Sequence, residues 1–348
     1  MTIHHGSSLK TPRPVCPLCQ NTEMGPMFSG IQDRLGHVQG EFSFLRCLRC
    51  GSIVLHPFPK DEDLESFYPE SYRVRRPSSD ENLASKLQSV IWKMLFLPVY
   101  RSDVKAVMQM TGMEKGRLLE IGCSSGYHLR EFVERGEYEI HGLDVDKHAV
   151  DHARKDLGPH IRNIPLHAAD FPSNTFDIVI LFNVLEHLVK PAEMLREVRR
   201  ILKGGGYLVI KTQFIDSLQG RIFGSRWMIV NEAPRHVLLP SAEGMRALFH
   251  RTGFETANRK PASLLENSVH VALSILPGAT ENIAFGSDRG LNGYLRRLVG
   301  CGIGLAAIPY ALIERMCGRS GTMIYLGQKQ DEPDLDTVRS FRKALGVP

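Results

Sequence analysis

The residues with the clearest chemical potential are two glycines and two acids in one short part of the chain. An apolar run carries Glu120 near its end and passes into a small-residue turn, Gly122–Gly126. A second apolar run ends at Asp144, 22 positions after Gly122. Glycines let a backbone approach a ligand closely, and an acid about 20 residues further on can accept hydrogen bonds from ribose hydroxyls. The spacing therefore predicts a nucleotide-type binding site in a strand–helix–strand unit.

The composition of this turn narrows the choice of ligand. It reads Glu120-x-Gly122-x-x-x-Gly126, not the G-x-G-x-x-G that brings a helix N-terminus onto a pyrophosphate. A carboxylate at the strand end would repel a diphosphate but suits a ligand that carries cationic groups. The turn resembles the first motif of the class I S-adenosylmethionine (SAM) methyltransferases.

Segments further along the chain extend this resemblance. The run FDIVILFNVLEHL at 176–188, followed by EVRRILKGGGYLVI at 197–210, closely resembles the middle of class I methyltransferases. The likeness covers roughly 118–254 and the last strand, and a subgroup of bacterial methyltransferases with an N-terminal zinc ribbon extends it to the N-terminus. The resemblance implies that the methionine part of SAM is contacted by Glu120, Gly122, Ser124 and Gly126, with Asn183 nearby. It also implies that Asp144 contacts the ribose and that the adenine is contacted by Asp170 and Phe171.

Two histidines are candidate bases. The methyl group of a sulfonium transfers by in-line displacement, so a base is needed only where the acceptor must lose a proton. His187 follows the strand expected at 176–182, and His236 lies in the segment 212–240, which is expected to face the acceptor. A structural role is equally open for His187, and Glu186 could orient a histidine or cap the next helix.

Four of the seven cysteines form two C-x2-C pairs, namely Cys16, Cys19, Cys47 and Cys50. Two such turns can close a tetrahedral four-thiolate zinc site, which leaves no open coordination position, so the spacing predicts a structural zinc ribbon. The alternative is four ordinary cytosolic cysteines. The apolar or glycine-rich surroundings of the other three favour packing roles for Cys123, Cys301 and Cys317.

The elements that must position these residues predict an α/β fold, a Rossmann-like doubly wound sheet of seven strands. Strands are expected at 117–121, 138–144, 165–171, 176–182, 207–211, 254–260 and 322–327, the last antiparallel as the resemblance implies. The main helices are expected at 83–110 (broken by Pro98), 127–133, 147–157, 194–202 (stopped by the glycines 204–206) and 241–253. The predicted organisation is a disordered lead-in (1–14), a zinc ribbon (15–56), a linker with N-terminal helices (57–112), a SAM-binding core (113–330) with insertions at 212–240 and 262–320, and a tail (331–348).

Composition constrains the partners only weakly. The 348 residues carry a net charge of +5, and Lys and Arg are scattered, so nucleic-acid binding is permitted but not indicated. The cysteines and the lack of a secretory signal indicate a reducing cytoplasm. The favoured function is SAM-dependent O- or C-methylation of a small-molecule acceptor, such as a sugar or nucleotide-linked sugar. An RNA methyltransferase that grips RNA with its ribbon is the second hypothesis, which is disfavoured because the ribbon offers as basic residues only Arg34, Arg46 and Arg49. A non-catalytic scaffold is the third.

An uncharged run at 298–313 leaves several roles open. It contains three glycines and Pro309 and is short for a transmembrane helix, which needs about 20 apolar residues. Flanking arginines could suit a membrane surface. A helical hairpin packed on the domain or on a dimer partner is favoured, followed by peripheral contact of 294–317 with the inner membrane and by a lid over an apolar substrate.

Overall fold

The computed structural model describes residues 14–68, 83–276, 299 and 302–330. For residues 83–95 it describes the backbone alone. The expected lead-in up to residue 13, residues 69–82 of the expected linker, Cys301 and the tail at 331–348 lie outside the described residues.

The described residues form a seven-stranded sheet with the order β10-β11-β8-β7-β4-β5-β6. The strands are β4 (Lys115–Ile121), β5 (Glu137–Leu143), β6 (Ile161–Arg162), β7 (Phe176–Phe182), β8 (Leu202–Gln213), β10 (Phe254–Pro261) and β11 (Thr322–Lys329). The five strands from β8 to β6 pair in parallel, whereas β11 runs antiparallel to both β8 and β10. The predicted α/β sheet with an antiparallel last strand is confirmed.

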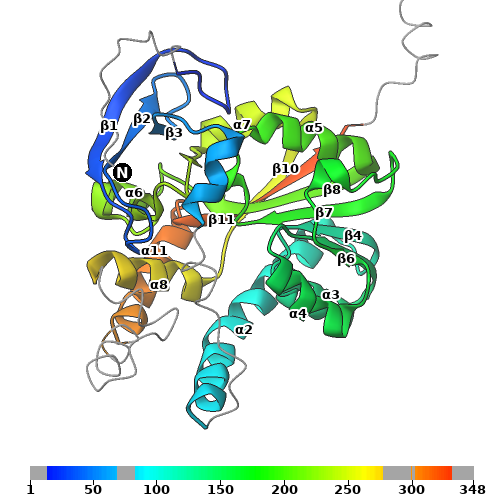
Figure 1. The fold of residues 1–348 in the computed structure, drawn as a ribbon. Helices are drawn as coiled ribbons and strands as arrows, with labels where there is room; N and C mark the ends of the chain where they lie inside the picture. Colours follow the sequence, from blue (N-terminus) through cyan, green and yellow to red (C-terminus); the bar gives the residue numbers. More distant parts are fainter. Residues whose placement is uncertain (1–13, 69–82, 277–298, 300–301, 331–348) are drawn as a thin grey trace, which may run out of the picture.

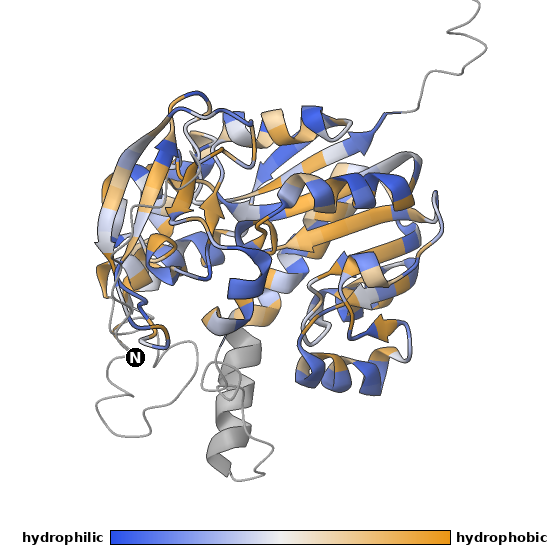
Figure 2. Cartoon of the chain, turned by 45° about the horizontal axis from the view of Figure 1, so that its top comes forward, coloured by the Kyte–Doolittle hydropathy of each residue, from blue (hydrophilic) through white to orange (hydrophobic). Residues whose placement is uncertain are grey.

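Helices cover both faces of this sheet (Figure 1). On one face, α5 (Pro191–Ile201) and α7 (Ala242–Arg251) pack against one core cluster. On the other, α2 (Leu83–Thr111), α3 (Tyr127–Arg135) and α4 (Lys147–Leu157) pack against a second. Successive strand residues point to opposite faces, so parallel strands covered on both sides are continuously apolar. Figure 2 shows this as hydrophobic strands enclosed by amphipathic helices.

Three local predictions were wrong in their details. The helix expected to break at Pro98 continues through it, because an internal proline removes one backbone hydrogen bond while Val99, Val104 and Val107 still anchor α2 in the core. The glycines at 204–206 do not stop α5, which ends at Ile201. They lie inside β8 instead.

The third wrong prediction concerns the strand expected at 165–171. The pairing β6 covers only Ile161–Arg162, and the following residues form the 3-10 turn η2 (Leu166–Ala168). Pro165 precedes this turn and has no backbone N–H to donate to a neighbouring strand. Asp170, the acid at the end of this segment, therefore follows a turn and not a strand.

A second, four-stranded sheet within the described residues has the order β1-β2-β3-β9. The segment around the cysteines supplies β1 (Met24–Ile31), β2 (Phe42–Cys47) and β3 (Ile53–His56), but β9 (Leu238–Leu239) comes from the insertion after β8. The same insertion holds α6 (Leu218–Phe223), η4 (Gly224–Arg226) and η5 (Val230–Glu232), with Trp227 fully buried. The ribbon and the insertion therefore share one sheet and one core cluster.

The remaining described elements lie around the end of the main sheet where the parallel strands finish. They are η1 (Asp61–Phe67), η3 (Leu185–His187), α8 (Leu264–Ile275) and α11 (Ile308–Met316). Helix α11 packs on α8, and its buried Glu314 accepts hydrogen bonds from the backbone and side-chain nitrogens of Gln219 at 3.1 and 2.8 Å. Within the described part of the chain, no helix is both long and apolar enough to cross a membrane.

Candidate active site

The turn after β4 requires both of its glycines. Gly122 has a φ of +77°, and a Cβ there would lie 2.4 Å from Val184 Cγ2. Gly126 has a φ of +74°, and its Cβ would lie 2.6 Å from Leu157 Cδ1. Left-handed backbone and close packing thus exclude larger residues at both positions, which leaves open backbone at the end of the strand.

Asp144 ties the end of β5 to this turn. One carboxylate oxygen accepts from the backbone N–H of Ser124 at 2.7 Å, and the other accepts from the backbone N–H of Asp146 at 2.8 Å. Each carboxylate oxygen can accept more than one hydrogen bond. Asp144 is therefore held in one orientation while it keeps acceptor capacity for a ligand's hydroxyls.

Glu120 begins a chain of buried charged groups. Its Oε1 lies 2.9 Å from His128 Nδ1, and the other ring nitrogen lies 3.3 Å from an oxygen of Asp103. Lys211 donates to the same Asp103 oxygen at 2.6 Å and to Glu266 at 3.3 Å. The chain joins α2, β4, α3, β8 and α8 at the edge of the sheet that carries the glycine turn.

One buried acceptor of this chain has no hydrogen-bond partner among the described residues. Burial raises the pKa of Glu120, and nearby His128 offsets only part of this effect. Burial lowers the pKa of His128, but the two carboxylates outweigh it, so the net shift is upward. Glu120 Oε2 is buried and accepts no hydrogen bond from any described residue. The ammonium group of a ligand could donate a hydrogen bond to this oxygen, so the residues around Glu120 fit the methionine end of SAM.

Sequence reasoning identified Glu120 but missed His128, Asp103 and Lys211. The available signal was the single lysine near the end of the apolar strand β8, where both faces of the sheet are covered. A charge at such a position needs a buried partner.

The residues expected at the adenine end follow η2 and lie beside Phe176, the first residue of β7, where the Phe171 carbonyl accepts from Arg200 of α5 at 2.7 Å. Asp170 is exposed with a φ of +50°, and the Phe171 ring is half-buried. The guanidinium of Arg162 lies 4.8 Å from the Phe171 ring centroid, and the Phe176 ring meets it edge-on at 4.9 Å. These contacts hold Phe171 in place beside an exposed carboxylate.

Asn183 follows β7 in a left-handed conformation, with a φ of +54°. Its side-chain oxygen accepts from the Gln213 amide at 3.0 Å, which fixes its orientation. The two candidate bases lie together in space, with the ring centroids of His187 and His236 4.9 Å apart. Burial, followed by the neighbouring His187, lowers the pKa of His236 well below its usual range, so this imidazole is neutral at physiological pH.

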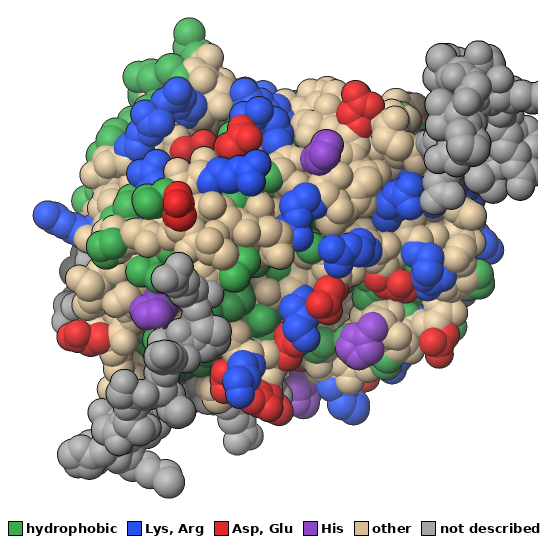
Figure 3. Space-filling view, turned by 90° about the horizontal axis from the view of Figure 1, so that it is seen from above, with side chains coloured by type: hydrophobic (Ala, Val, Ile, Leu, Met, Phe, Trp, Pro, Cys, Tyr) green, Lys and Arg blue, Asp and Glu red, His purple; other side chains and the backbone are tan. Residues whose placement is uncertain are grey.

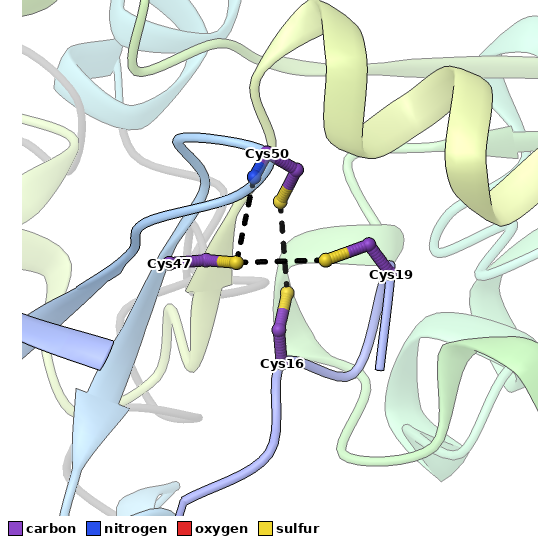
Figure 4. A group of neighbouring side chains, drawn as sticks. All are labelled: Cys16, Cys19, Cys47 and Cys50. Atoms are coloured by element: carbon purple, nitrogen blue, oxygen red, sulfur yellow. Dashed lines mark hydrogen bonds between the residues drawn. The ribbon is translucent and has the colours of Figure 1, made fainter. Parts of the chain in front are cut away.

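The four predicted zinc ligands converge in one buried group (Figure 4). The Sγ atoms of Cys16 and Cys50 lie 3.7 Å apart and those of Cys19 and Cys47 lie 3.5 Å apart, with no disulfide between them. The backbone N–H of Cys50 points to the sulfur of Cys47 at 3.5 Å. The four sulfur atoms lie within 4.8 Å of one another, an arrangement compatible with one four-coordinate ion.

A basic hollow of about 470 Å³ lies at the C-terminal end of α5. It is lined by Ser173, Asn174, Arg196, Arg199, Arg200, Gly204 and Lys329. Figure 3 shows Lys and Arg side chains spread over the face that carries α5 and α7. Arg196 and Arg200 are exposed, and the Arg200 guanidinium also donates to Glu197, to the Ser173 hydroxyl and to the Phe171 carbonyl.

Comparisons with known proteins agree with this geometry. Residues 100–258 match the family model described as a methyltransferase domain. The chain is 30% identical over 172 residues to the tRNA U34 carboxymethyltransferase of Alteromonas mediterranea, covering 45% of this chain and 51% of that protein. It is also 30% identical over 173 residues to the tRNA U34 carboxymethyltransferase of Methylococcus capsulatus, covering 45% of this chain and 51% of that protein. The chain thus spans about half the length of the curated relatives it matches.

Among solved structures, cyclopropane synthase MmaA2 from Mycobacterium tuberculosis aligns with a TM-score of 0.45 and 19% identity, covering 65% of this chain and 84% of that one. It is the match of residues 100–258 to the family model that identifies a methyltransferase domain in this chain, as the glycine turn predicted.

The expected acceptor needs correction. The relatives are named for tRNA, which contradicts the expectation of a sugar or other small-molecule acceptor and of no nucleic-acid partner. That expectation rested on the resemblance to the ribbon-bearing subgroup and on the small number of basic residues in the ribbon. The basic residues of α5 form a hollow together with Lys329, which is more than 120 residues away in the chain.

Proposed function

We propose that this protein is a SAM-dependent methyltransferase that modifies RNA, with a tRNA as its acceptor. The observation that carries this proposal is the 30% identity of the methyltransferase region to enzymes named for tRNA modification. The buried charge chain, the glycine turn and the basic hollow support it. A cytoplasmic location, where tRNA is found, belongs to the same proposal.

The roles of the cofactor residues follow from their geometry. When bound, SAM supplies a methyl group on a positively charged sulfur. The free Oε2 of Glu120 would accept from the methionine ammonium group, and Asp144 would accept from the ribose hydroxyls. Asp170 and Phe171 would border the adenine, with Phe171 held by Arg162. Gly122, Ser124 and Gly126 would let the methionine part lie against the backbone.

The acceptor would enter beside Asn183, where η1 and η3 meet. The Tyr68 hydroxyl lies 3.0 Å from His187 Nδ1, so residues just after η1 approach the candidate bases. Holding the acceptor atom in line with the methyl group, away from water, is the main contribution such a site can make. His187 and His236 remain the candidates for receiving a proton where the acceptor must lose one.

The basic hollow would hold the RNA backbone. Phosphates bind Arg and Lys without regard to sequence and supply most of the salt-dependent affinity. Arg196, Arg200 and Lys329 surround a space that is large enough for a phosphate group. In this proposal the hollow positions the RNA, and the sheet edge performs the transfer.

A zinc ion bound by the four cysteines would hold the ribbon on the domain. The backbone carbonyl of Leu18, between two of the ligands, accepts from Arg251 of α7 at 2.7 Å. A Cβ at Gly244 would lie 2.1 Å from Ser52 Oγ, so α7 and the second cysteine turn are in close contact. With four thiolates and no open position, the ion would be structural.

The test is transfer of label from radioactive SAM to a pool of tRNA, followed by mass spectrometry of the nucleosides. We expect a labelled nucleoside with the wild type and none with Asp144→Asn, whereas Asp151→Asn, on the exposed side of α4, serves as control. Binding of SAM without label in any RNA would contradict the RNA acceptor. Failure to bind SAM would contradict the enzyme itself.

A further inference from the structure

Three metal-ligand side chains outside the glycine turn converge in one small space. Glu186 and His187 belong to η3, and His236 lies just before β9. One ligand atom of each lies within 4.8 Å of those of the other two. The backbone N–H of Val237 donates to the Glu186 carbonyl at 2.8 Å, which joins the two segments.

Hydrogen bonds determine which nitrogen of each histidine carries a lone pair. His236 Nδ1 lies 2.8 Å from the carbonyl oxygen of Ile229. His187 Nδ1 lies 2.9 Å from the carbonyl oxygen of Arg235 and 3.0 Å from the Tyr68 hydroxyl, which can accept as well as donate. Because a carbonyl oxygen only accepts, each Nδ1 carries the proton and each Nε2 the lone pair. Histidines that bind metals commonly donate their other ring N–H to a backbone carbonyl in this way.

Glu186 supplies a third donor. The residue is 0% exposed, and its Oε2 accepts from the Thr212 hydroxyl at 2.9 Å. Its Oε1 is buried and accepts no hydrogen bond from any described residue. An ionised carboxylate with one oxygen unpaired is costly in such surroundings, and coordination of a metal by that oxygen is one way to remove the cost.

We propose that Glu186, His187 and His236 bind a divalent transition-metal cation through Oε1 and the two Nε2 atoms. Two imidazoles and one carboxylate are a donor set used by zinc and other first-row ions, and three protein ligands leave coordination positions open. This site therefore differs in kind from the closed four-cysteine group. A role of the open positions in holding an acceptor oxygen rests on the proposed function, but the binding of the metal does not.

Mn²⁺ is the probe for this site, because thiolates prefer softer ions and the cysteine group can keep its own metal. Titration of the full chain is followed by the paramagnetic resonance signal of free Mn²⁺, without SAM or RNA. We expect one tight Mn²⁺ per chain in the wild type and binding at least about tenfold weaker in Glu186→Gln and His236→Gln. Thr212→Val, which removes only the hydrogen bond to Glu186, should weaken binding about 10- to 100-fold.

Glu193→Gln, an exposed acid in the first turn of α5, is the matched control and should bind as the wild type does. Circular dichroism and thermal melts without metal identify variants that fail to fold. Nitrogen hyperfine coupling of the bound Mn²⁺ tests for imidazole ligands in the wild type alone. No tight site, no nitrogen coupling, or equal binding by the wild type and the ligand variants would overturn the proposal, whatever the outcome of the RNA assay.

Discussion

At the scale of single residues, Lys211 links the cofactor site to the stability of the fold. Its side chain is 3% exposed and contacts two carboxylates, those of Asp103 and Glu266. Burial lowers the pKa of Lys211, but these carboxylates raise it by more, so the lysine is charged. Lys211 thus compensates the negative charge of Asp103, whose carboxylate contacts His128, the hydrogen-bond partner of Glu120.

We expect Lys211→Met to lower the free energy of unfolding by about 3 to 5 kcal/mol, because it leaves buried carboxylates without a cation. The matched control is Lys203→Met in the same strand, whose lysine is 44% exposed and pairs with Asp177. That variant should lose at most about 1 kcal/mol. Urea denaturation measures both, and equal losses would show that the buried chain has no special energetic role.

A second residue-scale prediction concerns acid. Burial raises the pKa of Asp33, but the guanidinium of Arg235 and the backbone N–H groups of the following loop outweigh it, so the pKa is below the usual 3.8. The folded state therefore binds this proton less readily than the unfolded chain. The resulting stability is present above about pH 4 and is lost as the pH falls through the folded-state value.

Unfolding free energies measured between pH 7 and pH 2.5 test this expectation. Asp33→Asn should be less stable than the wild type by about 3 to 5 kcal/mol at pH 7. The gap should narrow below pH 4, because the wild type then loses the same charge. A gap that stays constant with pH would mean that the Asp33 charge contributes nothing.

At the scale of elements, the sequence predicted strands and helices well wherever apolar periodicity was unbroken. The strand at 176–182 and the helix at 147–157 were predicted with their observed bounds. The strand is buried on both faces and is continuously apolar, whereas the helix is buried on one face and has apolar residues at helical spacing. Proline and glycine misled the prediction. Pro98 stays inside a helix that tertiary packing holds, and the glycines after α5 lie in a strand that pairs with its neighbours.

The ribbon shows what periodicity cannot predict at this scale. Its fourth strand has only two residues, and it comes from a segment nearly 200 positions away, so no local pattern marks it. Arg235 of that segment forms two hydrogen bonds to Asp33, at 3.0 and 2.6 Å. Such pairings depend on the fold as a whole.

Removal of metal from the four cysteines should therefore disturb the insertion as well as the ribbon. We expect about one zinc per chain, and its removal by a chelator should shift the fluorescence of Trp227 to longer wavelength as its core cluster opens. Cys47→Ser should abolish the zinc, whereas Cys317→Ser, an exposed cysteine outside the group, should retain it. Unchanged fluorescence after complete loss of zinc would contradict a role in holding the two segments together.

At the scale of the whole molecule, the cofactor half of the site was predictable and the acceptor half was not. The glycine turn and Asp144 lie within one strand–helix–strand unit, so their spacing in sequence reflects their spacing in the fold. The basic hollow and the histidine–glutamate cluster combine residues from distant segments. Their chemistry appears only when the sheet brings the segments together.

The basic hollow carries the last prediction, which concerns binding of RNA. If Arg196 and Arg200 contact phosphates, replacing both by glutamine should weaken tRNA binding and reduce the slope of log affinity against log salt by about 1 to 2. Both side chains are exposed, but Arg200 also pairs with Glu197 and donates to the Ser173 hydroxyl and the Phe171 carbonyl, so a thermal melt of the variant checks that the fold is kept.

The matched control is Lys147→Gln with Lys155→Gln, which removes two exposed charges from α4 and gives the same change in net charge. Filter binding at several salt concentrations measures both double variants against the wild type. A loss confined to the α5 variant places the RNA on the basic hollow, since a general effect of net charge would lower both affinities alike. Equal slopes for all three proteins would remove the hollow from the RNA interface and would leave the acceptor to be held by the ribbon and the histidine cluster.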